Sequence, residues 1–440
     1  MTEDKPSKKK AVPGRRLTRF SKMVQLAGGV AGSMVAEGTK QLSQGNRPKI
    51  RDLLLTPKNA RRVADQLANL RGAAMKLGQL LSMDGGDFLP PELADILARL
   101  RSNAESMPTK QLVKVLQNAW GEDWQDNFSQ FDMNPIAAAS IGQVHKAVTH
   151  DGRTLALKIQ YPGVRKSINS DVDNVATLLR ISTLLPKELE ISELLEEAKI
   201  QLHQEADYIR EAKYLKRYGE QLAGAENFLI PEVDDELTTK DILAMTFVDG
   251  HPIEELVHED ESTRNRVMTL LLDLLFKEIF EFQLVQTDPN FANYQYNTEE
   301  QSLVLLDFGA TREYKKRFSN AYKAFFKAAM KEDMVGLRKA SERIGYFKED
   351  ISDQHLDFVQ NLFFMATEPL RFEGEYDFAN TDLGARLSDA GMELSLEQGY
   401  WHTPPVDSLF LHRKVGGLFL LAARLKAKVN VNALAQQYLN

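Results

Sequence analysis

The sequence predicts an α+β protein in which strands in the middle of the chain are flanked by helical segments. A β-hairpin is expected at Asp151-Gly152, because an Asp-Gly pair between alternating apolar runs is typical of tight hairpin turns. Amphipathic patterns with helical spacing occur before it, over Arg61–Met83, and near the end, over Leu409–Lys428, and a further helix is expected over Lys110–Ala119. The 440 residues, 43% of them hydrophobic, suffice for two or three domains.

The composition excludes several classes of protein. The chain has no cysteine, which excludes a disulfide framework, a thiolate zinc site and a cysteine nucleophile, and which is compatible with a reducing compartment. The longest uncharged apolar-rich run, Met23–Ala36, is too short to span a bilayer. The first residues, MTEDKPSKKK, lack the apolar segment of a signal peptide. We therefore expect a cytoplasmic protein that is at most peripheral to a membrane.

Charge is unevenly distributed along the chain. Residues 1–50 contain seven Lys and four Arg against three acidic residues, a net charge of +8, so the remainder of this −7 chain carries −15. Residues 1–22 are expected to form a disordered basic arm, and Met23–Leu42 a helix with Gly28 and Gly32 at GxxxG spacing. Residues 1–42 can therefore contact an anionic membrane or a second copy of the chain. The alternatives are a solubilising tail and a helix that packs within the protein. No nucleic-acid partner is predicted.

A chemically distinctive stretch runs from Gln286 to Ala310. Asp288 is followed five positions later by Asn293, and the apolar strand Leu303–Leu306 then ends in Asp307-Phe308-Gly309. Protein kinases space a catalytic-loop aspartate, a metal-binding asparagine and the aspartate of Asp-Phe-Gly in this way. Asp288 would act as the base or orient a water molecule, and Asn293 and Asp307 would hold Mg²⁺ against the phosphates of ATP. The alternative is a polar turn between a helix and an edge strand.

The other parts of a kinase site occur upstream in the expected order. Ala-Leu-Lys158-Ile matches the third-strand lysine pattern, so Lys158 would hold the α- and β-phosphates. Where kinases have a phosphate-binding glycine loop, this chain has Ala137, Ala138, Ala139 and Ser140, and the missing glycines stiffen the loop. The strands Phe228–Val233 and Ile242–Val248 would complete a small lobe, with Met245 and Val248 on the adenine side.

One long helix is expected over Ser192–Tyr218, and its carboxylates occupy two faces. Glu205 lies within the apolar stripe, and a buried carboxylate needs a cationic or hydrogen-bonding partner. Asp207 and Glu211 lie on a different face. One face can therefore reach Lys158 while the other meets a separate cation. The alternative is an ordinary acidic surface helix.

Five segments together resemble the UbiB/AarF family of atypical protein-kinase-like proteins. They are Lys76-Leu77-Gly78-Gln79, Ala137–His145, Glu205-Ala206-Asp207-Tyr208, Asp288-Pro289 with Asn293, and Asp307-Phe308-Gly309. The resemblance implies a bilobal protein-kinase-like fold with an added N-terminal helical extension over the cleft. The extension carries the KxGQ motif, whose Gln79 would help to gate the cleft.

The resemblance also assigns partners and an activity. Lys76 would pair with Glu205 and Asp207 and so contribute to gating, which leaves Glu211 to pair with Lys158. The family is associated with nucleotide binding, with ATPase activity stimulated by lipids or phenolic compounds, and with support of isoprenoid-quinone synthesis. Its alanine-rich loop disfavours ordinary protein-kinase activity.

One segment departs from the family pattern. The usual catalytic stretch is H-x-D-P-H-P-G-N, whereas this chain has QTDPNFAN over Gln286–Asn293. Both histidines and the Pro-Gly pair are absent, but Asp288 and Asn293 remain. Metal binding is therefore expected to persist, while the loop conformation and the catalytic rate depend on what replaces the missing residues.

The sequence thus divides into a basic arm (1–22), a helical extension with the KxGQ motif (23–125), a kinase-like N-lobe (126–250) and a helical C-lobe (251–440). We expect an ATP- and Mg²⁺-binding kinase-like ATPase that supports isoprenoid-quinone (ubiquinone) or related lipid metabolism. Its expected partners are nucleotide and an isoprenoid lipid or quinone precursor. Two alternatives stay open: a phosphotransferase for a small molecule or protein, and a non-catalytic scaffold switched by nucleotide.

Overall fold

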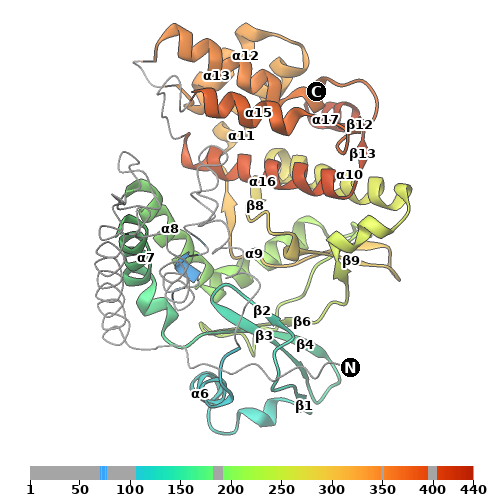
Figure 1. Ribbon diagram of the computed structural model, residues 1–440. Coiled ribbons are helices and arrows are strands. Elements are labelled where there is room, and N and C mark those ends of the chain that lie inside the picture. The colour runs from blue at the N-terminus through green and yellow to red at the C-terminus, as the bar shows by residue number, and fades with distance from the viewer. Residues whose placement is uncertain are drawn as a thin grey trace, which may run out of the picture. The chain divides into compact units, whose positions relative to one another are not determined.

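The computed structural model describes residues 70, 72–74, 76, 106–181, 192–347, 351–394 and 404–439 (Figure 1). These residues belong to two compact units. The first unit holds the described residues up to Ala212 together with Val233–Phe247. The second unit holds Lys213–Glu232 and the described residues from Val248 onward. The fold is α+β, because both units contain strands and helices.

The first unit is built on a five-stranded antiparallel sheet. Its strand order is β1-β3-β4-β6, and β2 pairs with β3 beside this path. The strands are β1 (Gln130–Phe131), β2 (Ala137–Ala138), β3 (Gly142–Val148), β4 (Thr154–Gln160) and β6 (Ile242–Thr246). The helical elements are α6 (Thr109–Trp120), η1 (Trp124–Asn127), α7 (Val164–Ile181), α8 (Ser192–Glu205) and the beginning of α9 (Tyr208–Gln221).

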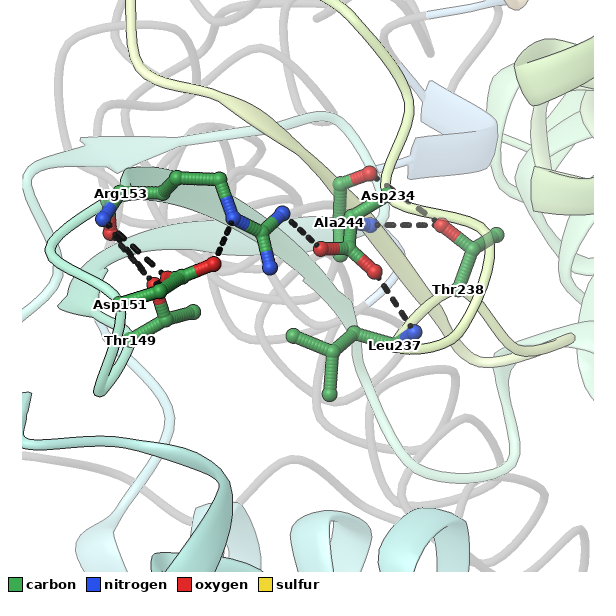
Figure 2. Close-up of polar contacts among 7 residues, drawn as sticks. All are labelled: Thr149, Asp151, Arg153, Asp234, Leu237, Thr238 and Ala244. Atoms are coloured by element: carbon green, nitrogen blue, oxygen red, sulfur yellow. Dashed lines mark hydrogen bonds and ion pairs between the residues drawn. The ribbon is translucent and has the colours of Figure 1, made fainter.

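The predicted hairpin at Asp151-Gly152 is confirmed, because β3 and β4 pair antiparallel on either side of it. Gly152 has a φ of +85°, a conformation that glycine adopts without steric cost. Arg153 fixes the turn: its Nε donates to Oδ2 of Asp151 at 2.7 Å and its Nη1 to Oδ2 of Asp234 at 2.6 Å (Figure 2). The turn is thus tied to the loop that precedes β6.

One face of this sheet forms the core of the first unit. Along β4, side chains alternate between the two faces, so Leu155, Leu157 and Ile159 share one side. They pack with Leu116 of α6 and with Trp124, and all five residues are almost fully buried. The helix predicted at Lys110–Ala119 is therefore confirmed as α6. The opposite face of β4 carries Lys158.

The second unit combines small sheets with many helices. Its four-stranded sheet has the order β5-β10-β9-β7, and β8 pairs separately with β11, as β12 does with β13. The strands are β5 (Phe228–Leu229), β7 (His251–Pro252), β8 (Leu284–Gln286), β9 (Tyr294–Asn297), β10 (Ser302–Leu305), β11 (Thr311–Glu313), β12 (Tyr376–Asp377) and β13 (Lys428–Val429). The helical elements are η2 (Ile253–His258), α10 (Glu261–Lys277), η3 (Glu278–Phe282), η4 (Phe291–Asn293), α11 (Lys316–Met330), α12 (Met334–Ile344), α13 (Asp353–Ala366), α14 (Glu368–Arg371), α15 (Leu383–Met392), α16 (Val406–Arg424) and α17 (Val431–Leu439).

Short polar side chains begin several of these helices. Asp260 accepts a hydrogen bond from the backbone N–H of Thr263 at the start of α10, and Asp333 does the same from Gly336 at the start of α12. Ser352 caps α13 in the same manner. Such side chains satisfy N–H groups that have no partner within the helix, so they fix where each helix begins.

The single helix expected over Ser192–Tyr218 is wrong, because the chain breaks between α8 and α9. Asp207 lies at the break, and its Oδ1 accepts a hydrogen bond from the backbone N–H of Arg210 at 3.2 Å. This is the geometry of a helix cap, which starts a new helix at Tyr208. The expected apolar stripe consists of Leu195, Ala198, Leu202, Glu205, Ile209 and Ala212, and it does not continue across the break as a buried face, since Ile209 is 53% exposed.

A second correction concerns the strand expected over Phe228–Val233. Phe228 and Leu229 form β5, which pairs parallel with Leu303 and Val304 of β10 in the second unit. Only Val233 reaches β6, through an isolated bridge to Met245. The prediction failed because the pairing partner of a short apolar strand depends on distant residues rather than on its own pattern.

The helix expected over Leu409–Lys428 is present as α16, although it ends at Arg424 and Lys428 begins β13. Within the part of the chain that the structure describes, no helix has both the length and the apolar composition needed to cross a bilayer. The division into four domains stays a prediction.

Candidate active site

Lys158 lies on the face of β4 opposite the hydrophobic core. Lys158 is 7% exposed, and its Nζ lies 2.8 Å from Oε1 of Glu211, which is 2% exposed. The same Nζ lies 5.5 Å from the ring centroid of Tyr208. Each charge of this pair is removed from water, so each depends on the other for compensation.

Helix α9 is held against this face by apolar contacts. Tyr208 and Ala212 pack on Leu243 of β6, and these three residues are buried. Leu243 lies opposite Lys158 in the β4–β6 register, so the two side chains share a face. Glu211 lies between Tyr208 and Ala212 in the sequence, and the packing of α9 therefore directs it to Lys158.

Lys76 is 3% exposed and forms an ion pair with Oε1 of Glu205, at the end of α8. The other carboxylate oxygen of Glu205 accepts a hydrogen bond from Oγ of Ser140 at 3.1 Å. Gly72, one turn before Lys76, packs closely on the same loop: a Cβ there would lie 3.1 Å from Cγ2 of Ile141. Glu205 therefore connects Lys76 to Ser140 of the alanine-rich loop.

The alanine-rich loop (Ala137–Ser140) forms part of a tight β-hairpin with the strand that follows it. Ala137 and Ala138 form β2, which pairs with β3, and the backbone N–H of Ala139 donates to the carbonyl of Gly142 at 2.9 Å. Ala137 and Ala138 are exposed, and Ala139 is half-buried. Gly142 is required where it stands, because a Cβ there would lie 2.4 Å from the carbonyl oxygen of Ile159.

The expected ion pair of Lys76 with Asp207 is not formed, and the expected adenine-side residues are placed as follows. Asp207 pairs with Arg165, with Nη2 and Oδ1 3.4 Å apart, and Lys76 has Glu205 as its ion-pair partner. The expected pairing of Lys76 with both carboxylates is therefore corrected: Asp207 lies at the break between two helices and is directed elsewhere. Met245 and Val248 are half-buried, and they belong to different units.

In the second unit, Asp288 follows strand β8. Its Oδ1 lies 3.0 Å from Nη2 of Arg413 on α16, and the two side chains are 17% and 7% exposed. Strand β8 is held by β11, with Gln286 opposite Thr311, so the segments before Asp288 and after Asp-Phe-Gly are adjacent. Thr287 strengthens this link, because its Oγ1 donates to the carbonyl of Ala310 at 2.7 Å.

Asn293 and Asp307 lie at the same end of the β9–β10 pair. Tyr294 of β9 is opposite Leu305 of β10, and the backbone N–H of Leu306 donates to the carbonyl of Asn293 at 2.8 Å. Asp307 follows at once, with a φ of +60°, and its Oδ1 accepts from the N–H of Gly309 at 3.1 Å. Left-handed backbone at a non-glycine residue is uncommon and is typical of functional positions.

The residues at this end of the hairpin fit a magnesium ion that also binds phosphate. Asn293 is 6% exposed, and its Nδ2 has no hydrogen-bond partner among the described residues. No group of three or more His, Asp or Glu residues in the described ranges could hold a metal by itself. Magnesium commonly takes only one or two protein oxygens and completes its shell with phosphates and water, which agrees with a set limited to Asn293 and Asp307.

A buried polar cluster contacts both ends of the loop Gln286–Asn293, here called the catalytic loop, and was not predicted from the sequence. Nζ of Lys414 on α16 lies 2.8 Å from Oη of Tyr294, 3.2 Å from Oε1 of Gln286 and 3.3 Å from Oε2 of Glu278. Tyr218 donates to Oε1 of Glu278 at 2.9 Å. A sequence signal existed: a lysine interrupts the apolar face of α16, and a charge on such a face needs a buried partner.

Burial and charge act on this cluster in opposite directions. Burial lowers the pKa of Lys414, but the charge of Glu278, the neighbouring Tyr294 and the hydrogen bonds to both together outweigh it, so the pKa lies above its ordinary value and the lysine stays protonated. Burial raises the pKa of Glu278 above the usual range of a carboxyl group, in spite of the nearby ammonium. The cluster is thus a tightly coupled pair surrounded by hydroxyl and amide partners.

Several expectations fall outside the described residues. They are Gln79 of the KxGQ motif, the basic arm at residues 1–22, the helix with Gly28 and Gly32, and the membrane or dimer contact through residues 1–42. These stay predictions.

A comparison with protein-family models matches residues 99–341 to the ABC1 atypical kinase-like domain, which is more than half of the chain. The mitochondrial atypical kinase coq-8 of Caenorhabditis elegans is 38% identical over 97% of this chain, and the chain spans 58% of that relative. The mitochondrial atypical kinase COQ8 of Saccharomyces cerevisiae is 36% identical over 98% of the chain, which spans 86% of it.

Among solved structures, one of Rv3197 with erythromycin from Mycobacterium tuberculosis has a similar fold. Its TM-score is 0.60 at 23% identity, over 87% of this chain and 95% of that one. The family model, the relatives and the order of the motifs agree with one another. The chain belongs to the UbiB/AarF family of atypical protein-kinase-like proteins.

Proposed function

We propose that the chain binds ATP and Mg²⁺ and acts as an atypical kinase-like ATPase. The observation that carries this proposal is the buried ion pair between Lys158 and Glu211. Kinases require such a lysine–glutamate pair to place the lysine on the α- and β-phosphates. A buried ion pair is costly to remove from water, so apolar residues would serve a purely structural role at these positions equally well.

Each site residue has a role in this proposal. Glu211 fixes the side chain of Lys158, which binds the α- and β-phosphates, and Ala137, Ala138, Ala139 and Ser140 cover them. Asn293 and Asp307 would hold Mg²⁺, which supplies positive charge against the phosphate oxygens when bound. Met245 and Val248 would contact the adenine.

Asp288 is suited to orienting an attacking water molecule. Arg413 holds its Oδ1, and Oδ2 makes no hydrogen bond within the described part of the second unit. The guanidinium fixes the direction of the carboxylate and leaves the second oxygen to accept a hydrogen bond from the nucleophile. For hydrolysis, Asp288 has to orient only a water molecule, whereas transfer to a protein also requires space for a peptide.

Access to the site would be controlled by Lys76, Gln79, Glu205 and Asp207. The contact of Glu205 with both Lys76 and Ser140 supports this assignment, because it ties the KxGQ motif to the alanine-rich loop. Ordinary protein-kinase activity is disfavoured by the same loop, which has alanine in place of glycine.

The metabolic role proposed here is support of isoprenoid-quinone, or ubiquinone, synthesis or related lipid metabolism. It rests on membership of the UbiB/AarF family and on the relatives named as mitochondrial atypical kinases. We include a peripheral membrane contact and homodimer formation through residues 1–42 in the proposal. The division into extension (23–125), N-lobe (126–250) and C-lobe (251–440) belongs to it as well, whereas the expected cytoplasmic location stays a prediction.

A second candidate is a non-catalytic scaffold that is switched by nucleotide. The altered loop Gln286–Asn293 and the pairing of Asp288 with Arg413 favour it, since a carboxylate held by a guanidinium is less available as a base. Biological activity that persists in Asp288→Asn with nucleotide binding intact would support the scaffold.

The test of nucleotide and metal binding is a titration of the full chain with ATP, with and without Mg²⁺. Wild type is expected to bind ATP in a Mg²⁺-dependent manner, and Asp307→Asn to lose that dependence. Asp357→Asn, on the exposed surface of α13, is the matched control and is expected to bind like wild type. Unchanged Mg²⁺-dependent binding by Asp307→Asn would reject the site.

A further inference from the structure

Helix α16 supports the catalytic loop through three residues on adjoining positions of its surface. Arg413 contacts Asp288, Lys414 contacts Gln286 and Tyr294, and Gly417 lies against Pro289. Lys414 thus contacts the two ends of the loop, and Arg413 and Gly417 contact two adjacent residues between them. Helix α16 also holds the segment after Asp-Phe-Gly, through the ion pair of Asp407 with Arg312 at 3.3 Å.

Gly417 allows the loop to approach the helix more closely than any other residue would. A Cβ at this position would lie 2.3 Å from Cβ of Pro289 and 3.4 Å from its Cα, and the first of these is far below a normal contact. A Cβ built on the neighbouring Gly416 would have no other atom within 4 Å. The requirement for glycine therefore belongs to position 417 alone and arises from the loop, not from the helix.

Lys414 fixes the two ends of the loop to one another. Its ammonium contacts Gln286, the last residue of β8, and Tyr294, the first residue of β9. The hydroxyl of Tyr294 also donates to Oε1 of Gln286 at 3.2 Å. Glu278 completes the cluster, because its Oε1 accepts the backbone N–H of Gln286 at 3.2 Å. Gln286 occupies the place of a family histidine, so the cluster anchors the loop at one of the altered positions.

Asn290, another altered position, makes hydrogen bonds within the loop. Oδ1 of Asn290 accepts from the N–H of Ala292 at 3.3 Å, and the carbonyl of Asn290 accepts from the N–H of Asn293 at 3.0 Å. These bonds shape η4 but do not connect the loop to the rest of the unit. Thr287 and Asn293 connect the ends of the loop to Ala310 and Leu306, and α16 supplies the contacts to Asp288 and Pro289 between them.

We infer that Lys414 and Gly417 are positioning residues: Gly417 sets the distance of the catalytic loop from α16, and Lys414 fixes its two ends. This inference rests on the proposed function, in which Asp288 orients the attacking water. An outward shift of Pro289 moves Asp288 directly, because the two residues are adjacent. The proposed Mg²⁺ ligands Asn293 and Asp307 adjoin the paired ends of β9 and β10, away from Pro289, so nucleotide binding is less affected than turnover.

The first test compares Gly417→Ala with Gly416→Ala in the full chain. Both substitutions raise helix propensity equally, so a purely structural effect would be the same in both. Gly416→Ala is expected to match wild type in kcat and KM for ATP. Gly417→Ala is expected to lower kcat by about 10- to 100-fold, with KM changed by less than about threefold. Equal kcat values in the two variants would overturn the inference.

The second test separates the role of Lys414 from simple stability. Lys414→Met leaves Glu278 buried without a cation, so it is combined with Glu278→Gln, which removes that charge. The double variant is expected to unfold cooperatively and to show the same fall in kcat at nearly constant KM. A double variant with wild-type kcat would overturn the role of Lys414.

Amide hydrogen exchange at residues 286–294 supplies a readout that does not depend on ATP turnover. Gly417→Ala and the double variant are expected to exchange faster there than wild type, while Gly416→Ala exchanges at the wild-type rate. Exchange that is unchanged in both variants would reject the positioning role. Absence of turnover in wild type, together with faster exchange in the variants, would reject the ATPase proposal and leave the positioning role supported.

Discussion

The ammonium of Lys158 lies 2.8 Å from a carboxylate oxygen of Glu211, and both residues are almost fully buried. Lys158 lies on β4, whose other face packs in the hydrophobic core. Glu211 lies on α9, and the residue that caps this helix, Asp207, is four positions earlier. Because neither charge can be solvated, the pair is sensitive to the loss of either member.

Glu211→Gln is therefore expected to destabilise the protein, because the substitution removes the carboxylate charge that lies 2.8 Å from the buried ammonium of Lys158. We expect a loss of about 3–5 kcal/mol in the free energy of unfolding, measured by urea denaturation. The control is Glu342→Gln, which breaks an exposed pair with Arg338 on α12 and should cost no more than about 0.5 kcal/mol. Equal losses in the two variants would contradict the buried role.

The link between Lys76 and the alanine-rich loop gives a second prediction. Lys76→Met removes the ion pair with Glu205 and so weakens the hold on Ser140. Amide exchange over Ala137–Ile141 is expected to become faster. Lys316→Met, on the exposed surface of α11, serves as the control and should leave that exchange unchanged. The same rate in both variants would argue against the link.

A third prediction concerns acid stability. The hydroxyl of Thr149 and the guanidinium of Arg153 lower the pKa of Asp151 from 3.8 to about 2 (Figure 2). A carboxyl group with a lowered pKa stabilises the fold fully above its unfolded pKa and loses that contribution as the pH falls through its folded pKa. The difference in stability between wild type and Asp151→Asn should therefore be constant near neutral pH and shrink by about half at pH 3.

This third prediction can be checked by thermal unfolding of the two proteins at several pH values from 3 to 6. A difference that stays the same at pH 3 and pH 6 would show that the charge of Asp151 does not contribute. A difference that grows as the pH falls would reverse the sign of the argument.

Local patterns predicted the parts of the fold that depend on nearby residues. The hairpin at Asp151-Gly152, the helix α6 and the strand that ends before Asp307 were all expected and are present. Each is specified within about ten residues by a turn pair or a hydrophobic period. The family resemblance added the contacts of Lys158 with Glu211 and of Lys76 with Glu205, which no local pattern gives.

The features that were missed depend on distant partners or on one side chain. The break in Ser192–Tyr218 depends on the capping role of Asp207, because acidic residues are also common inside helices. The pairing of β5 with β10 joins residues far apart in the chain. The cluster of Lys414 brings together four separate segments, so its existence could be suspected from a lysine on an apolar face but its partners could not be named.

The central claim is that this chain hydrolyses ATP with Asp288 orienting the attacking water. The most direct measurement is ATP hydrolysis by wild type and Asp288→Asn with Mg²⁺, with and without anionic liposomes and a phenolic analogue of a quinone precursor. We predict hydrolysis by wild type that rises with the lipid or the phenol and is lost in Asp288→Asn. Tight Mg²⁺-dependent nucleotide binding without turnover under any of these conditions would contradict the claim and favour the nucleotide-switched scaffold.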